Sequence, residues 1–181
     1  MSEIEEISQK FLLRAIFLKF IFYTMKTNLD MDRTNSLGLL NYSKEFYEAA
    51  NIIRNDKGAI STVAYYLICH SLELSFKAFL RGKGDSINSL KKLGHDLEKI
   101  LKKAEGKNIK DLMQISDEYR EAISIVSTYY CEKEFEYIKT GFKTFPNIDI
   151  LLRFAEDILS NIHKFCINNM RHHNGKQTAI S

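Results

Sequence analysis

Residues 59–80 read AISTVAYYLICHSLELSFKAFL, and they form the longest and most apolar segment of the chain. The apolar residues surround the axis of a helix instead of lying on one face, which is typical of a helix enclosed by others. The segment ends at Gly82-Lys83-Gly84-Asp85, where glycine stands at a position that favours a helix stop. We therefore predict that this helix is the centre of a helical bundle.

Periodicity and chain breakers predict further helices on both sides of the central one. Asp96 stands where its side chain can cap the first turn of a short helix. Pro146 marks the entrance to the last long helix. The predicted segments are an N-terminal one that ends near Asn28, then 37–54, 97–104, 110–134 and a last one from Pro146 to about Asn168.

The composition excludes β architectures. The 181 residues include one proline and eight glycines, whereas an all-β protein needs a turn about every 8–12 residues. The length suits one domain of ordinary size, and 45% hydrophobic with 27% charged residues is the balance of a folded globular protein. We predict an all-α, up-and-down bundle of about five helices over residues 31–170, preceded by an apolar helix and linker (1–30) and followed by a flexible tail (171–181).

The N-terminal run FLLRAIFLKFIFYTM, residues 11–25, is not expected to be a signal peptide or a membrane span. The run is shorter than the roughly 20 residues that a bilayer requires, and Arg14 and Lys19 interrupt it. Acidic residues precede it, whereas a signal peptide begins with basic ones. The three cysteines are odd in number and show no C-x-x-C spacing, so we expect free thiols, which fit a reducing cytosol. We predict a cytoplasmic protein whose N-terminal helix packs on its own domain or on a partner, with membrane association and a start at Met31 as the alternatives.

Motifs of the common cofactor enzymes are absent. The chain has no G-x-x-x-x-G-K-[ST] loop, no G-x-G-x-x-G, no H-E-x-x-H and no G-x-S-x-G. Gly82-Lys83-Gly84 resembles a phosphate loop only superficially and is better explained as a helix stop. We therefore predict no cofactor and no bound metal.

Ionisable residues lie within the apolar central segment. His70, Glu73 and Lys77 are spaced so that their side chains project from one face of a helix. Glu73 and Lys77 can pair at the i,i+4 spacing, and His95 brings a second histidine to the next helix entrance. Because a buried charge is costly unless it is paired, we predict that these four residues form a buried polar network that fixes the helix register. A ligand or phosphate site, and a zinc site, are the alternatives.

Three segments of the chain resemble the HEPN domain family. The run H-x-L-E-L-x-x-K-A-x-L begins at His70, G-H-D-L-x-x-I-L begins at Gly94, and YIKTGFKTFP spans residues 137–146. The resemblance covers about residues 37–165 and implies a compact helical bundle. Many members are metal-independent ribonucleases of toxin–antitoxin, phage-defence and CRISPR systems, whose site forms at a homodimer interface from an arginine and a histidine with four to six residues between them. Others bind nucleotidyltransferases, RNA or nucleotides.

The ribonuclease motif of that family is missing from this chain. Arg153 and His163 are too far apart, and Arg171-His172-His173 is too close. The resemblance therefore implies a noncatalytic module, homodimeric, that binds RNA, a nucleotide or a protein such as a nucleotidyltransferase in a prokaryotic defence or toxin–antitoxin context. The alternatives are a metal-independent ribonuclease with a non-standard site at His70 or His95, and a helical dimerisation or adaptor module.

Positive charge is concentrated in one part of the chain. The formal net charge is only +3, but residues 77–110 contain ten basic residues against four acidic ones. A basic face of this kind neutralises phosphates, and Lys99, Lys102 and Lys103 are its candidate nucleic-acid contacts. An ordinary solvated helix explains the same pattern.

A second basic segment is interleaved with aromatic residues. Lys139 and Lys143 alternate with Tyr137 and Phe142, which is the composition of surfaces that bind single-stranded nucleic acid. The alternative is a solvated loop whose aromatic residues anchor in the core.

Overall fold

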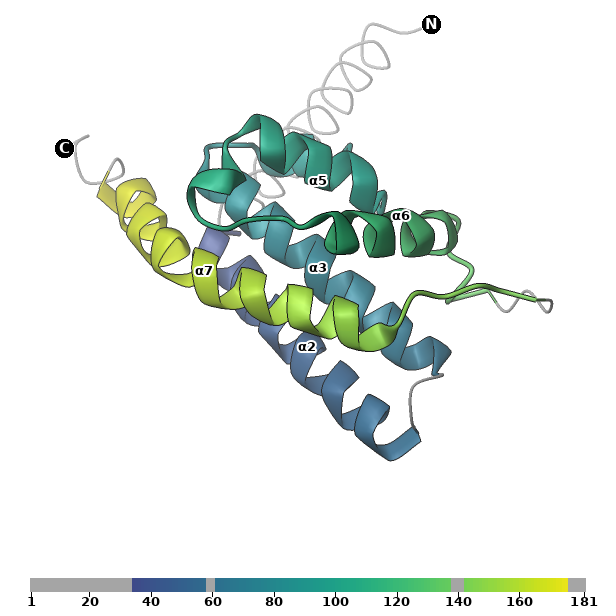
Figure 1. Ribbon diagram of the computed structural model, residues 1–181. Helices are drawn as coiled ribbons and strands as arrows, with labels where there is room; N and C mark the ends of the chain where they lie inside the picture. Colours follow the sequence, from purple (N-terminus) through teal and green to yellow (C-terminus); the bar gives the residue numbers. More distant parts are fainter. Residues whose placement is uncertain (1–33, 58–60, 138–141, 176–181) are drawn as a thin grey trace, which may run out of the picture. The chain divides into compact units, whose positions relative to one another are not determined.

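The computed structural model describes residues 34–57, 61–137 and 142–175, and every element in these ranges is helical. The chain divides into two units after Thr34. The predicted N-terminal helix and linker, residues 1–30, lie outside the described residues. In these ranges no helix has the length and apolar character needed to cross a bilayer. The predicted all-α bundle is confirmed (Figure 1), and its elements are α2 (Ser36–Lys57), α3 (Thr62–Gly82), α4 (Ile87–Lys91), α5 (Leu97–Gly106), the 3-10 turn η1 (Ile109–Asp111), α6 (Asp117–Cys131) and α7 (Ile148–Gly175).

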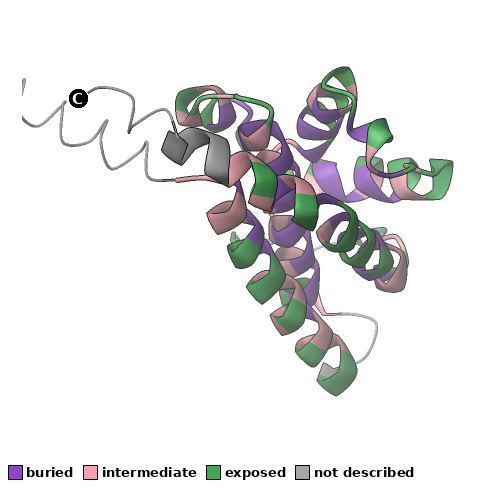
Figure 2. Ribbon diagram, turned by 90° about the vertical axis from the view of Figure 1, so that its left-hand side faces the viewer, coloured by how far each residue is buried: buried purple, intermediate pink, exposed green. Residues whose placement is uncertain are grey.

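α3 is the central helix of the bundle, as its composition predicts. α2 and α7 lie on one side of it, and α5 and α6 on the other (Figure 1). Figure 2 shows buried residues on the faces that the helices turn toward one another. Phe76 of α3 meets Phe154 of α7 with ring centroids 5.8 Å apart, and both are fully buried. Burying a side chain of this size contributes roughly 1.5–3 kcal/mol, so such contacts hold the outer helices on α3.

Serine hydroxyls form hydrogen bonds between α2 and α3. Ser43 Oγ donates to the Ser71 carbonyl at 2.7 Å and lies 2.6 Å from Ser75 Oγ. Ser71 Oγ donates in turn to the Ser43 carbonyl at 2.9 Å. All three side chains are fully buried. Because a serine is small, the two helices approach closely enough for side chains to reach the opposite backbone.

α7 runs antiparallel to α2 and is fastened to it at both ends. Ser36 Oγ donates to the Cys166 carbonyl at 3.1 Å near the start of α2. Near its other end, Arg54 holds Asp149 through two hydrogen bonds of 2.9 Å. This planar, two-point pairing of guanidinium with carboxylate also fixes the relative rotation of the two helices.

α5 begins beside the middle of α3, where His95 contacts Glu73. It ends beyond the end of α3, where Lys103 pairs with Asp85 at 3.0 Å. α5 therefore runs in the same general direction as α3, because the segment that contains α4 leads the chain back. The alternation of an up-and-down bundle is interrupted at this one place. Asp96 caps the first turn of α5, as predicted.

The predicted helix 110–134 is wrong at both ends. The helix begins only at Asp117, where Ser116 Oγ accepts from the Tyr119 amide at 3.2 Å, and it ends at Cys131. Leu112 and Ile115, whose spacing suggests a helix, lie in the preceding connection and pack against the core from there. Apolar spacing thus reported burial correctly but not helical structure.

Two further differences concern short or terminal segments. Periodicity does not predict α4, because its five residues are too few to show a period. α7 continues to Gly175, past the predicted end near Asn168, so part of the predicted flexible tail is helical. Residues 176–181 lie outside the described ranges.

The serine contact should be costly to remove. In Ser43→Ala the Ser71 carbonyl and the Ser75 hydroxyl lose a buried partner, and we expect the free energy of unfolding to fall by about 1–3 kcal/mol. Ser124→Ala, on the exposed side of α6, is the control and should change it by less than about 0.5 kcal/mol. Urea denaturation followed by circular dichroism measures both, and equal effects would contradict the assigned role of Ser43.

Candidate functional site

Glu73 is the centre of the polar cluster, and its side chain is only 3% exposed. Lys77, one turn along α3, donates to Oε1 at 2.5 Å and to the Gly94 carbonyl at 2.8 Å. Tyr130 of α6 donates to Oε2 at 2.6 Å, and His95 Nδ1 lies 2.8 Å from the same oxygen. The structure therefore brings Glu73, Lys77 and His95 together and adds Tyr130.

His70 joins the cluster through Tyr130. Its Nδ1 lies 2.7 Å from the Tyr130 hydroxyl and 3.7 Å from Glu73 Oε2. Its ring meets Phe46 of α2 edge-on, with centroids 4.4 Å apart. Tyr130 was not predicted as a site residue, because it occupies an apolar position of the α6 pattern. Its hydroxyl could have indicated a place in the polar cluster, because a buried tyrosine usually has a hydrogen-bond partner.

The network keeps Glu73 charged. Burial acts to raise the pKa of the Glu73 carboxyl, but the contacts with His70, Lys77 and Tyr130 outweigh it and lower that pKa from 4.5 to about 2. Burial and the neighbouring Glu73 charge raise the pKa of Tyr130 far above its ordinary value. At neutral pH the Tyr130 hydroxyl therefore holds its proton and Glu73 has none, which gives the bond between them a fixed direction.

These protonation states determine the hydrogens on both histidines. The single Tyr130 proton goes to Glu73, so the bond between Tyr130 and His70 requires His70 Nδ1 to donate. An ionised carboxylate only accepts, so His95 Nδ1 donates as well. Each imidazole therefore carries a proton on Nδ1 and, when neutral, a lone pair on Nε2. The His70 and His95 side chains are 22% and 39% exposed.

No metal centre is formed by the part of the chain that the structure describes, which contains no group of three or more histidine, cysteine, aspartate or glutamate side chains suited to an ion. For the zinc alternative, His70, His95 and Glu73 would have to direct lone pairs at one point. Their nearest ring nitrogens instead carry protons that point to Tyr130 and Glu73. The arrangement is that of a hydrogen-bond network joining α3, α6 and the start of α5.

Two of the predicted lysine contacts are paired with carboxylates. Lys103 Nζ lies 3.0 Å from Asp85 Oδ2. Lys143 Nζ lies 2.9 Å from Glu134 Oε2, and its side chain is only 15% exposed. A phosphate would have to displace these carboxylates, so both lysines are better described as links within the bundle.

The other lysine candidates on α5 are unpaired. Lys99 and Lys102 are exposed and make no ion pair with any residue in the described ranges. Lys92 before them and Lys110 after them share both properties. Lys139 lies outside the described residues. Lys99 and Lys102 thus differ from their neighbour Lys103, which pairs with Asp85.

The aromatic residues of the second basic segment are exposed. Tyr137 is 68% and Phe142 112% exposed, so neither is a core anchor. Phe135 and Phe145 have that role, with ring centroids 5.8 Å apart, and Tyr65 of α3 stacks on Phe145 at 4.6 Å. Phe135 and Phe145, on either side of Tyr137 and Phe142, are therefore the partly buried aromatic residues that pack against the core.

Comparisons of the chain with known protein families, with curated proteins and with solved structures give no match. The HEPN resemblance accordingly rests on the three sequence segments alone. What it implies about activity and partners stays a prediction, and the proposals below rest on the geometry of the described residues.

Acid should remove the part of the stability that depends on Glu73. Because the folded-state pKa is about 2 and the ordinary value is 4.5, the charged carboxylate stabilises the fold above about pH 4.5, and this contribution is lost as the pH falls toward 2. The pKa difference corresponds to on the order of 3 kcal/mol. Glu73→Gln should be less stable at neutral pH and should lack this acid-dependent loss.

Urea denaturation at about pH 6 and about pH 3 measures the difference. Glu121→Gln, an exposed substitution on α6, is the matched control and should keep the pH dependence of the original chain. The same pH dependence in Glu73→Gln would contradict the assigned state of Glu73.

Proposed function

We propose that the chain is a HEPN-like, noncatalytic module that binds RNA through the lysines of α5. The observation that carries this proposal is that Lys99 and Lys102 are exposed and make no ion pair with any described residue, and they lie one helical turn apart on the most basic part of the chain. A lysine without a carboxylate partner neutralises a phosphate without first breaking an ion pair. Asp96 and the Glu73 network hold α5 in place, so these lysines project from a fixed helix.

The geometry of the histidines supports a noncatalytic role. His95 donates to Glu73, and His70 reaches it through Tyr130. Both residues thereby connect helices, which is a structural role for partly exposed polar groups beside an apolar core. The absence of the arginine–histidine spacing of the family's ribonucleases agrees with this role.

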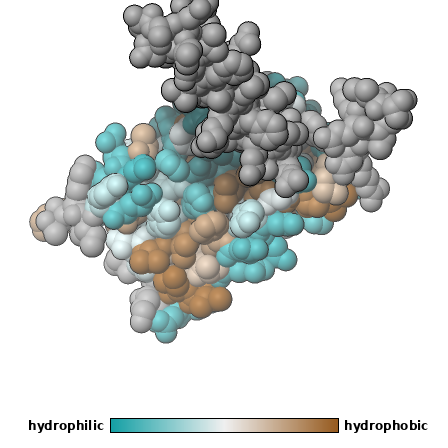
Figure 3. Space-filling model, turned by 180° about the vertical axis from the view of Figure 1, so that it is seen from behind, coloured by the Kyte–Doolittle hydropathy of each residue, from teal (hydrophilic) through white to brown (hydrophobic). Residues whose placement is uncertain are grey.

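A protein partner is the second part of the proposal. Figure 3 shows a group of apolar side chains on the rear face of the bundle. Separately, Tyr42, Ile52 and Val63 are the exposed large hydrophobic side chains of α2 and α3 within the described residues, each more than half exposed. Exposed apolar surface of this kind is a feature of interaction sites. We assign it to the homodimer or nucleotidyltransferase contact that the resemblance implies, in a cytoplasmic defence or toxin–antitoxin context.

Charge reversal tests the RNA surface. Lys99→Glu with Lys102→Glu should weaken RNA binding and lower the slope of log affinity against log salt by about 2, since each phosphate contact contributes roughly 1. Lys44→Glu with Lys164→Glu, two exposed lysines of α2 and α7, is the control of equal charge change. Fluorescence anisotropy with a labelled RNA measures both slopes, and equal losses in the two variants would reject α5 as the site.

A second candidate function, a metal-independent ribonuclease, is favoured by the hydrogens on the two histidines. With Nδ1 protonated and held, each Nε2 is the atom that can exchange a proton with a substrate. One imidazole would take the proton of a ribose 2′-hydroxyl as that oxygen attacks phosphorus. The other, in its protonated form, would give a proton to the leaving 5′-oxygen. Glu73 would stabilise the imidazolium that forms on His95.

Total RNA incubated with the purified protein in EDTA tests this candidate. Cleavage is expected to continue in EDTA, to be lost in His70→Ala with His95→Ala, and to persist in His163→Ala, an exposed histidine of α7. Intact RNA with the original chain, or cleavage that survives the double substitution, would reject the ribonuclease.

A further inference from the structure

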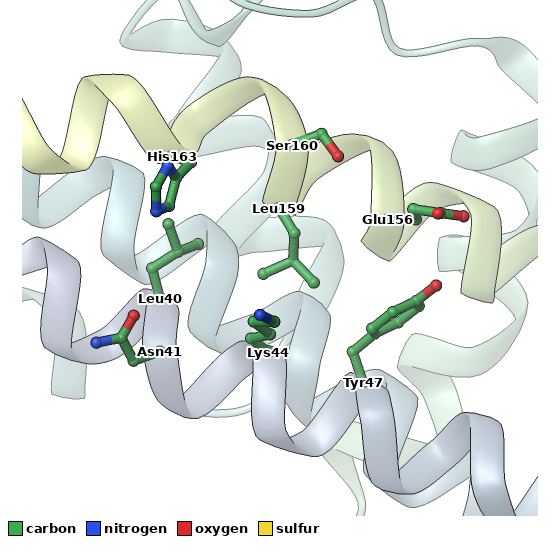
Figure 4. A pocket seen from close by; sticks show the side chains of 8 residues that line it. All are labelled: Leu40, Asn41, Lys44, Tyr47, Glu156, Leu159, Ser160 and His163. Atoms are coloured by element: carbon green, nitrogen blue, oxygen red, sulfur yellow. The ribbon is translucent and has the colours of Figure 1, made fainter.

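A pocket of about 390 Å³ lies between α2 and α7. This volume is at the small end of the range of about 300–1,000 Å³ that ligand pockets have. Leu40 is 2% exposed and forms an apolar floor with Leu159. Polar side chains of both helices surround that floor (Figure 4), namely Asn41, Lys44, Tyr47, Glu156, Ser160 and His163.

The antiparallel packing of α2 and α7 explains how these residues meet. The two helices are fastened near both ends, and the pocket lies between the fastenings. Glu156, Leu159 and His163 recur at three- and four-residue steps, so they lie on one face of α7. The same holds for Leu40, Lys44 and Tyr47 on α2, and the two faces form the opposite walls of the pocket.

The walls carry two opposite charges that are available to a ligand. Glu156 makes no hydrogen bond or ion pair within the described residues. Lys44 has only a contact of 3.7 Å with Glu48, whose side chain is 56% exposed. An exposed pair of this kind contributes little. In Figure 4, Glu156 and Tyr47 lie toward one end of the pocket, His163 toward the other, and Lys44 between them.

We propose that this pocket binds a free α-amino acid with a large apolar or aromatic side chain. The α-ammonium group pairs with Glu156, the α-carboxylate pairs with Lys44, and the side chain covers Leu40 and Leu159. A zwitterion fits because it supplies one charge of each sign, as the two walls do. A fatty acid or a nucleotide would supply only negative charge and would leave Glu156 without a partner.

Three probes that share the phenylalanine side chain and carry different backbone charges test this assignment. L-phenylalanine carries both charges, N-acetyl-L-phenylalanine lacks the ammonium, and L-phenylalaninamide lacks the carboxylate. Amide chemical shifts of the isotope-labelled full chain report where each probe binds. L-phenylalanine should give saturable shifts on α2 and α7 around the pocket, and each blocked probe should bind roughly tenfold more weakly, because it loses one charged hydrogen bond.

Two variants test which pocket residue binds each charged group of the amino acid. Glu156→Gln should weaken the binding of L-phenylalanine by roughly the same factor. It should leave the affinity for N-acetyl-L-phenylalanine unchanged, since that probe has no ammonium group to pair with Glu156. Lys44→Gln should weaken the binding of L-phenylalanine and leave the affinity for L-phenylalaninamide unchanged. Glu121→Gln and Lys164→Gln, both exposed and outside the pocket lining, are the controls and should bind all probes as the original chain does.

Several results would overturn the proposal. These are the absence of saturable shifts at millimolar L-phenylalanine, shifts that lie outside α2 and α7, and equal affinity for the three probes. Variants that weaken all three probes by one factor would also overturn it. Because all four substituted side chains are exposed, circular dichroism should show an unchanged fold in every variant, and binding is compared among variants that meet this condition.

Discussion

The buried carboxylate of Glu73 sets the arrangement of three helices. It accepts hydrogen bonds from Lys77 on its own helix, from Tyr130 on α6 and from His95 at the start of α5. A buried charge that loses one of its partners is strongly destabilising. α5 and α6 therefore cannot shift along α3 by even one residue without breaking the network.

The fixed position of α5 decides which of its lysines face solvent. Lys103 points back to Asp85 at the end of α3, while Lys99 and Lys102 remain exposed and unpaired. Lys102 and Lys103 are adjacent in sequence but differ in chemistry, because a helix turns by about 100° per residue. The proposed RNA surface is thus a consequence of the same network that places the histidines.

The fold was largely predictable from the sequence, and the site only in part. The enclosed apolar pattern of α3 identified the central helix. The spacing of His70, Glu73 and Lys77 identified the cluster, to which His95 was added from the next helix entrance. Tyr130 was not predicted, because helical periodicity treats its ring as core and ignores its hydroxyl. Ser43 was missed because a single serine in a helix ordinarily indicates solvent. Pairing of Lys103 with Asp85 depends on the path of α4, which has no periodic signal.

The Glu73 network determines which nitrogen carries the proton in both histidines. Nitrogen-detected NMR of the imidazole rings measures this directly, because protonated and unprotonated ring nitrogens have distinct shifts. Neutral His70 and neutral His95 should both be protonated at Nδ1, and Glu73→Gln should lower the share of this form at His95. Protonation of both neutral rings at Nε2 would contradict this expectation, because neither histidine could then donate to the cluster.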